Sequence, residues 1–391
     1  MSELSDDLSE ELGSELCFGV VGYGNIGRTH VATLASGAVK RARVSSVVAR
    51  GDADLPDGVK RHATLDDLLA ANEVDAVIVA TPTMTHPSVG LAVLAARRHL
   101  VMEKPVAMSV QEVQQLVAAV PDGIHAAAML NQRYHPFYRK IKTIIASGEL
   151  GRIVRFNWIM TAWYRPDVYF LVSPWRGTWQ GEGGGALLNQ CIHNLDVLQW
   201  LLGLPESVVA DIGCGKFHDI EVEDEVSAIL SYPDGASGVL VASTGEAPGM
   251  NRFDIVGDRG TLRFDGETLT LLTSDQSVSE HCASTREMFS LPEFRQQDIS
   301  VGTEDNQHAC VLQDLVDAVL DGKPLATQLS EGVGSVELAN AILLSAWEDR
   351  RVKLPLDAGR YQSMLDERIA SSGLREPLDI NVDIDMEASY R

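Results

Sequence analysis

Two side chains far apart in the sequence have the chemistry to move a proton, Lys104 and His193. Lys104 stands in Glu103-Lys104-Pro105, directly after the apolar run 99–102, and the proline favours an extended backbone before it. An ammonium group there can polarise a carbonyl or stabilise a developing alkoxide. Histidine is the side chain that ordinarily titrates near neutral pH, so His193 can exchange a proton with a hydroxyl. We therefore predict that both are catalytic, although a surface lysine and a core histidine are the ordinary structural alternatives.

The residues around His193 suggest how its ring is oriented. A helix is expected from residue 185 to 202, after Gly183-Gly184-Gly185. Asn189 then lies one turn before His193 on the same face, where its amide can orient a substrate hydroxyl. Asp196, three residues on, is near enough to hydrogen-bond the imidazole and fix its tautomer.

Aromatic and cationic side chains gather in the middle of the chain, and four of the six tryptophans fall between Trp158 and Trp179. Flat rings stack on the C–H faces of a polyhydroxylated ring, and guanidinium and amide groups bind hydroxyls. The alternatives are a loop packed on its own aromatic rings, or an oligomer interface. The predicted substrate-binding residues, besides Asn189, are Asn131, Arg133, Trp163, Tyr164, Arg165, Trp175 and Arg176.

A glycine run near the start of the chain predicts a dinucleotide site. Gly22-Tyr23-Gly24-Asn25-Ile26-Gly27 follows the apolar segment 16–21 and precedes residues 29–35, which are typical of a helix. Gly22 permits a tight turn, Gly24 lets the backbone approach a pyrophosphate, and Gly27 lets helix and strand pack closely. The N–H groups at the helix start would face the phosphates. The alternative is a glycine-rich turn without a ligand.

Further cofactor contacts are expected where other strands end. The predicted residues, besides the run 22–26, are Arg50, Thr81, Pro82, Thr83, His86, Glu103 and Lys104. The acidic residue that binds an NAD ribose is absent at Ala49, and Arg50 could pair with the 2′-phosphate of NADP. The cofactor is therefore NAD or NADP, with NADP favoured, although the neighbouring Asp52 could reverse this preference.

The elements that must position these groups alternate at first between strand and helix. This pattern predicts a doubly wound parallel sheet, a Rossmann domain, over residues 16–135. Seven strand-like segments between 152 and 272, separated by turns, then predict an α+β domain over 136–375, with a large open sheet that is mainly antiparallel. Two late helices, about 305–321 and 331–350, would close the chain. An open sheet favours self-association, so we expect a homodimer or homotetramer.

The composition excludes several classes of partner. A formal charge of −23 repels phosphate backbones, so nucleic acid is not expected to bind. No apolar run is long enough to span a membrane, and the first residues are not expected to act as a secretory signal. Five cysteines without C-x-x-C spacing predict no metal site and a cytoplasmic protein. The acidic stretches 1–15 and 376–391 are expected to be solvated extensions.

Together these motifs resemble the family of glucose–fructose oxidoreductase, inositol 2-dehydrogenase and MocA. The resemblance covers about residues 16–350, and its order and spacing are specific. It implies a nicotinamide cofactor, and it matches Lys104 and His193 to the family's usual catalytic pair. Many members carry aspartate where this chain has Asn189.

The predicted function is hydride transfer between a nicotinamide and a ring carbon of a sugar, cyclitol or glycoside. One alternative is a lyase or glycoside hydrolase that oxidises the ring transiently and regenerates its cofactor. The other is a nucleotide-binding protein without catalytic activity.

Overall fold

A computed structural model describes residues 15–51, 53–302 and 306–378, so most of both acidic extensions, and Asp52, lie outside the described residues. The chain divides into two compact units. The first holds the described residues up to Val106, together with Val113–Asn131 and Asn306–Gly332. The second holds Ala107–Glu112, the described residues from Gln132 to 302, and those from Val333 onward. Residues 306–332 thus belong to the first unit rather than to the expected second domain.

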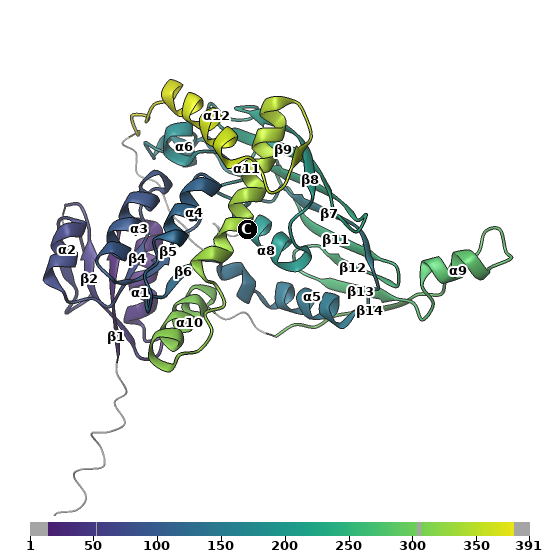
Figure 1. Ribbon diagram of the computed structural model, residues 1–391, viewed down its shortest axis with the longest axis horizontal. Helices are drawn as coiled ribbons and strands as arrows, with labels where there is room; N and C mark the ends of the chain where they lie inside the picture. Colours follow the sequence, from purple (N-terminus) through teal and green to yellow (C-terminus); the bar gives the residue numbers. More distant parts are fainter. Residues whose placement is uncertain (1–14, 52, 303–305, 379–391) are drawn as a thin grey trace, which may run out of the picture. The chain divides into compact units, whose positions relative to one another are not determined.

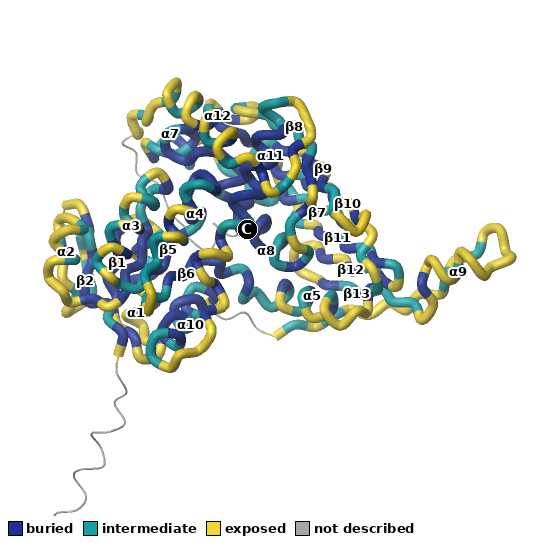
Figure 2. The backbone as a smooth tube through the Cα atoms, in the orientation of Figure 1, coloured by how far each residue is buried: buried dark blue, intermediate teal, exposed yellow. Residues whose placement is uncertain are grey.

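The first unit is built on a six-stranded parallel sheet in the order β3-β2-β1-β4-β5-β6. Its strands are β1 (Leu16–Val21), β2 (Ala42–Val48), β3 (Lys60–His62), β4 (Ala76–Val79), β5 (His99–Met102) and β6 (Ala126–Ala128). The order reverses between β1 and β4, which makes the crevice at their carboxyl ends the natural ligand site. The central strands are buried throughout, as their continuous apolar sequences predict (Figure 2).

Helices cover this sheet (Figure 1). Their bounds are α1 (Asn25–Ala35), α2 (Leu65–Ala71), α3 (His86–Ala95), α4 (Val110–Ala118) and α10 (Gln307–Asp321), with short 3-10 turns η1 (Thr83–Thr85) and η3 (Leu329–Glu331). Helix α4 begins, and the 3-10 turn η2 (Asn131–Tyr134) ends, in segments of the second unit. The predicted capping box that starts α2 is present at Thr64 and Asp67. Helix α10 lies against α1 and β6, so this late segment completes the first unit.

The second unit is built on a nine-stranded mixed sheet in the order β14-β13-β12-β11-β7-β10-β9-β8-β15. The strands are β7 (Ile153–Met160), β8 (Ser207–Cys214), β9 (Glu223–Ser231), β10 (Ser237–Ser243), β11 (Asn251–Gly257), β12 (Gly260–Phe264), β13 (Leu269–Thr273), β14 (Arg295–Asp298) and β15 (Val352–Lys353). All pairs are antiparallel except β7 with β10. The predicted fold class, a Rossmann domain followed by an α+β domain on a mainly antiparallel sheet, is confirmed.

One face of this sheet is buried and the other is not. Phe156, Trp158 and Phe253 are buried on the inner face, where Trp158 stacks on Phe253 at 4.1 Å between ring centres. On the outer face Ile229 and Val239, which are register partners, remain 52% and 40% exposed. The alternation is the pattern of a sheet that packs on one side only.

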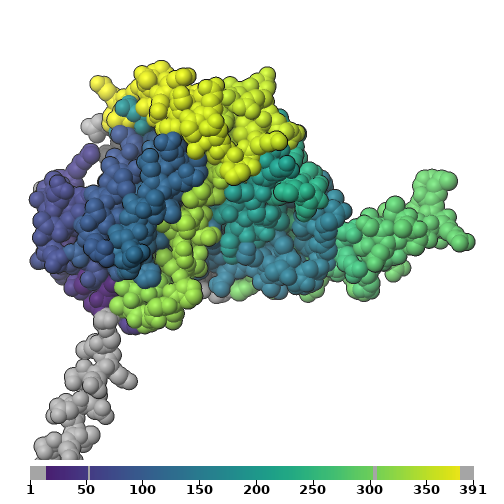
Figure 3. All heavy atoms as spheres, in the orientation of Figure 1, coloured from purple at the N-terminus to yellow at the C-terminus, as the bar shows by residue number. Residues whose placement is uncertain are grey.

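The remaining helices of the second unit are α5 (Pro136–Ser147), α6 (Asp167–Leu171), α7 (Trp179–Glu182), α8 (Ile192–Leu202), α9 (Val278–Ser284), α11 (Gly332–Glu348) and α12 (Ala358–Ser371). The expectation that two late helices close the chain was wrong, because α12 follows them. Its sequence is mostly polar and only Tyr361 and Leu365 are buried, so its periodicity is weak. Between β13 and β14, α9 extends away from the sheet of its own unit (Figures 1 and 3).

Among the described residues, no helix is long and apolar enough to cross a membrane.

The glycine turn after β1 yields a stability prediction. A Cβ on Gly27 would lie 2.0 Å from the carbonyl oxygen of Gly22, whereas a Cβ on Gly24 would meet nothing within 4 Å. We expect Gly27→Ala to lower the free energy of unfolding by about 2 kcal/mol or more, or to prevent folding. Gly24→Ala, the matched control, should cost less than about 1 kcal/mol. Urea denaturation measures both, and equal losses would contradict the prediction.

Candidate active site

The glycine run forms an open cradle between β1 and α1. Gly22 has a φ of +98°, and a Cβ there would lie 2.5 Å from the carbonyl oxygen of Ala80. Gly24 caps α1 without a side-chain hydrogen bond, and the space beside its Cα is open. Backbone N–H groups at a helix start and an open space next to them fit a pyrophosphate. The residues present therefore fit the dinucleotide that the motif predicts.

Tyr23 and Arg50, both predicted cofactor contacts, come from the turn after β1 and from the segment after β2. The hydroxyl of Tyr23 donates to the carbonyl of Asp54 at 2.6 Å, and the guanidinium of Arg28 lies 4.7 Å from the centre of the Tyr23 ring. Arg50 is exposed and follows the end of β2 closely, next to the buried Ala49. Its position after this strand is the one that contacts the adenosine ribose in such sheets.

Hydrogen bonds inside the loop after β4 hold its conformation. The Thr85 hydroxyl donates to Thr81 Oγ1 at 2.7 Å, and Thr83 is buried. His86 is 1% exposed, and its ring nitrogens lie 2.8 Å from the carbonyl oxygens of Thr81 and Pro105. His86 thus ties the loop after β4 to the loop after β5. Its predicted contact with the cofactor, like those of Thr81, Pro82 and Thr83, stays a prediction.

Lys104 is held by its neighbour Glu103. The Lys104 backbone N–H donates to Glu103 Oε2 at 3.0 Å, and Glu103 Oε1 lies 2.7 Å from Nε2 of His30. Both partners of this ion pair are buried. Burial alone would raise the pKa of Glu103, but the hydrogen bond and charge of His30, with His308 and Lys104, hold it at about 2. An ionised carboxylate therefore fixes the backbone from which Lys104 projects.

Sequence reasoning missed two histidines of this cluster, His30 on α1 and His308 on α10. Their rings meet edge to face with centroids 5.6 Å apart. Burial lowers the pKa of His308 to about 4, against the pull of Glu103. His30 lies three residues after Gly27, inside the helix that follows the glycine run. A polar residue at that position was the signal from which it could have been predicted. Nothing in the sequence placed α10 beside α1.

Asn131 belongs to the same unit. It is 2% exposed, and its amide donates to Gln307 Oε1 at 3.4 Å, at the start of α10. Its predicted contact with substrate stays a prediction.

In the second unit the segment before His193 is not the predicted helix. Helix α8 begins only at Ile192, and turns occupy 186–191. The buried carboxylate of Glu223 accepts the backbone N–H groups of Gly185 and Leu187 at 2.8 and 3.0 Å. These bonds tie the segment to β9. Asn189 therefore lies in a turn before the first helical turn that carries His193.

The predicted Arg133 and Asp196 form a buried ion pair. Arg133 donates from Nε and Nη2 to the two oxygens of Asp196 at 2.8 and 2.7 Å. Gln199 also donates to Asp196, at 3.0 Å. This bidentate geometry locks the helix that carries His193, which is 8% exposed. The roles of Arg133 toward substrate and of Asp196 toward the imidazole stay predictions.

Two of the predicted arginines lie over the ring of Tyr169 on α6, a residue that sequence reasoning missed. The guanidinium groups of Arg176 and Arg165 lie 4.0 and 5.3 Å from the centre of its ring. Arg176 also lies 5.2 Å from the Trp175 ring. Trp163 donates to Asn194 on α8 at 3.2 Å, and Tyr164 is 46% exposed. The cluster is thus partly packed on itself, and its predicted role in substrate binding remains a prediction.

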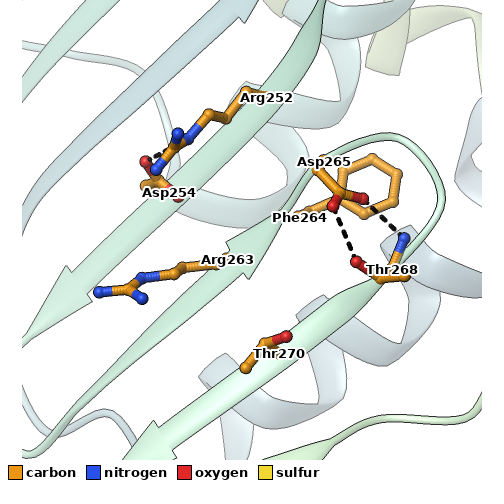
Figure 4. Close-up of a pocket in the computed structure, with 7 residues that line it drawn as sticks. All are labelled: Arg252, Asp254, Arg263, Phe264, Asp265, Thr268 and Thr270. Carbon is orange, nitrogen blue, oxygen red and sulfur yellow. Dashed lines mark hydrogen bonds and ion pairs between the residues drawn. The ribbon is translucent and has the colours of Figure 1, made fainter.

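A separate hollow of about 240 Å³ lies on β11, β12 and β13 of the second unit (Figure 4). Arg252 pairs with Asp254 there, and Asp265 accepts from the backbone and hydroxyl of Thr268. None of the residues that line this hollow is a predicted site residue.

Two family descriptions match this chain. "Oxidoreductase family, NAD-binding Rossmann fold" matches residues 16–123, and "GFO/IDH/MocA C-terminal domain" matches residues 138–263. The inositol 2-dehydrogenase of Rhizobium meliloti is 25% identical over 355 residues, which cover 86% of this chain and 98% of that protein. The levoglucosan dehydrogenase of Pseudarthrobacter phenanthrenivorans is 27% identical over 290 residues, 64% of this chain and 73% of that protein.

The fold is also that of solved dehydrogenases. The WlbA dehydrogenase from Bordetella pertussis, in complex with NADH and UDP-GlcNAcA, superposes with a TM-score of 0.73 and 27% identity. The match covers 88% of this chain and 100% of that one.

The half-buried His308 yields a prediction on pH. Its pKa is 6.5 in the unfolded chain and about 4 in the folded one, so the unfolded state binds more protons as pH falls between these values. The contribution of neutral His308 to the free energy of unfolding is therefore fully present above pH 6.5 and is lost as the pH falls toward 4. Between pH 7.5 and 4.5 the wild type should lose on the order of 2–3 kcal/mol through this residue.

In His308→Gln this loss should be smaller by that amount, as measured by urea denaturation at both pH values. The pKa of Glu103 falls from 4.5 in the unfolded chain to about 2 in the folded one, so its own contribution to stability is lost mainly below pH 4.5. An unchanged pH dependence in the variant would contradict the prediction.

Proposed function

Because the chain belongs to the Gfo/Idh/MocA family of NAD-binding oxidoreductases, we propose that it moves a hydride between a nicotinamide and a ring carbon of a sugar, cyclitol or glycoside. The observation that carries this proposal lies in the first unit. There the open cradle at Gly24 and the braced Lys104 stand at the carboxyl ends of strands in one parallel sheet. This is the edge at which such sheets bind and transform ligands.

Different residues bind the cofactor, polarise the substrate oxygen and transfer the proton. The cradle after β1 binds the pyrophosphate, and the cofactor supplies the hydride acceptor at its nicotinamide ring. Lys104 polarises the substrate oxygen with its ammonium group, which the buried Glu103 positions through the backbone. His193, on the helix locked by Arg133 and Asp196, takes the hydroxyl proton during oxidation and returns it during reduction.

The exposed outer face of the sheet supports self-association as a homodimer or homotetramer. Ile229 and Val239 are accessible there, and on the segment after α9 Met288, Phe289 and Leu291 are more than 80% exposed. Apolar groups this accessible are typical of protein–protein contacts.

The roles of the catalytic pair can be tested by turnover. Reduction of NAD and NADP should be followed with myo-inositol, levoglucosan and D-glucose. We expect Lys104→Met and His193→Ala each to lower kcat by about 10²–10⁴-fold, because each removes a proton-transfer or polarising group. Lys353→Met, an exposed lysine on β15, is the control and should keep full activity. Wild-type rates in either catalytic variant would refute the assigned roles.

Arg50 supports NADP as the preferred cofactor, because it follows the strand whose end contacts the adenosine ribose in such sheets, and a cation there can pair with a 2′-phosphate. Arg50→Ala should then raise KM for NADP about tenfold or more, while KM for NAD stays unchanged. Arg43→Ala, on an exposed arginine of the preceding strand, controls for general charge. A wild type that already prefers NAD, or an Arg50 variant with the same preference, would overturn the choice.

A further inference from the structure

Two donor groups of the second unit keep hydrogens that no described residue accepts. One is the guanidinium of Arg176, and the other is the hydroxyl of Tyr169 on α6. The guanidinium lies over the Tyr169 ring, 4.0 Å from its centre, so both donors belong to one small volume. Both residues are half-buried, which shields the donors from bulk water and leaves them accessible to a ligand.

We propose that Arg176 and Tyr169 form a subsite for a carboxylate group of the substrate, so that the substrate is an acidic sugar such as a uronic acid. This inference rests on the proposed function, because it concerns the sugar that exchanges a hydride with the nicotinamide. It narrows the substrate class from any sugar, cyclitol or glycoside to one that carries a negative charge.

The first step of the argument is the charge of Arg176. Its Nη1 donates to the backbone carbonyl of Tyr169 at 3.2 Å, and its Nε is buried without a hydrogen-bond partner in the described part of the chain. It forms no ion pair with any carboxylate that the structure describes. A half-buried cation without a counter-ion has lost part of its hydration, and an anionic ligand would compensate that loss.

Glu182 does not supply this counter-ion. Burial raises the pKa of Glu182 to about 7, against the Gly177 N–H and the positive charge of Arg176. Its two oxygens already accept from the Gly177 N–H, at 2.6 Å, and from the Asn189 amide. The acid is therefore bonded to other donors, and at neutral pH it is only partly ionised.

The second step is the direction of the Tyr169 hydroxyl. The side-chain amides of Asn189 and Gln190 each donate to its oxygen at 3.2 Å. With two donors directed at the oxygen, the hydrogen-bonding capacity that remains is the O–H itself. Among the described residues this hydrogen has no acceptor, so the phenol can donate it to a ligand.

These two donors favour a carboxylate over the other groups that a sugar carries. A carboxylate has two oxygens that only accept, so one can bind the guanidinium and the other the phenol. A sugar hydroxyl has no charge to balance that of Arg176. A phosphate has three terminal oxygens and a charge near −2, which is more than one guanidinium edge and one O–H can satisfy.

The local charge also favours an anion. The guanidinium of Arg165 lies 5.3 Å from the centre of the Tyr169 ring and adds a second positive charge next to that of Arg176. The whole chain carries a formal charge of −23. Two cations around one ring therefore attract a negatively charged group to this place, although the protein as a whole repels it.

The experiment compares acidic sugars with their neutral counterparts, using the full chain with NADH or NADPH present. The probes are D-glucuronate against D-glucose and D-galacturonate against D-galactose, which differ by a carboxylate in place of the CH₂OH group. Titration calorimetry measures each dissociation constant. We expect at least one acidic sugar to bind about tenfold or more tightly than its neutral counterpart.

Substitutions then test which side chains cause this preference. Arg176→Gln should abolish it, and Tyr169→Phe should lower it about threefold or more, because each removes a donor. Arg176→Lys keeps the charge without the planar fork and should retain part of the preference. Arg155→Gln, on an exposed arginine of β7, is the matched control and should keep the preference in full. A folding defect weakens both sugars of a pair alike, so it does not change this ratio.

The inference is overturned if neither acidic sugar binds more tightly than its neutral counterpart, or if Arg176→Gln leaves the preference unchanged. Tighter binding of D-glucose 6-phosphate than of D-glucuronate would also overturn it, because the subsite would then be one for phosphate. A wild type that shows the preference and its dependence on Arg176, but reduces neither NAD nor NADP with any of these sugars, overturns the proposed function instead.

Discussion

A carboxylate taken out of water must recover its lost hydration from donors or from an opposite charge, and this protein meets that demand in each of its two units. Glu103 is matched by His30 and by the Lys104 backbone. Glu223 is matched by the N–H groups of Gly185 and Leu187. In each case a backbone donor lies on a loop that carries a predicted functional residue. The requirement to satisfy a buried acid therefore also gives that loop a single conformation.

The same demand explains why these loops need glycine. A Cβ on Gly185 would lie 2.0 Å from the carbonyl oxygen of Glu223, and one on Gly183, which has a φ of +69°, would meet the Met108 side chain at 2.6 Å. At Gly185 the backbone must come this close for its N–H group to reach the acid. Gly185 is thus required by the close approach to β9, as Gly27 is required by the close approach of α1 to the turn after β1.

Prediction from sequence succeeded where a pattern reports local geometry. Continuous apolar runs located β4 and β5, the alternating segments from 152 to 272 located seven strands of the second sheet, and the glycine run located the turn into α1. It failed where long-range contacts override local preference. Residues 185–191 were predicted to be helical, but they form a bend and turns that hydrogen-bond to Glu223 on β9. The all-exposed β14 and the polar α12 left almost no apolar periodicity to detect.

The sequence alone determined the parallel sheet, the cradle for a dinucleotide and the identity of the family, because these depend on residue spacing along one segment. It also singled out Lys104, His193 and Asn189. Only the tertiary structure decided what holds them: His30 and His308 meet behind Glu103 because α10 packs on α1, and Glu182 meets Asn189 across a turn. Such partners come from segments with no shared periodicity. They are brought together by burial and hydrogen bonding only once the chain has folded, so no local sequence pattern predicts them.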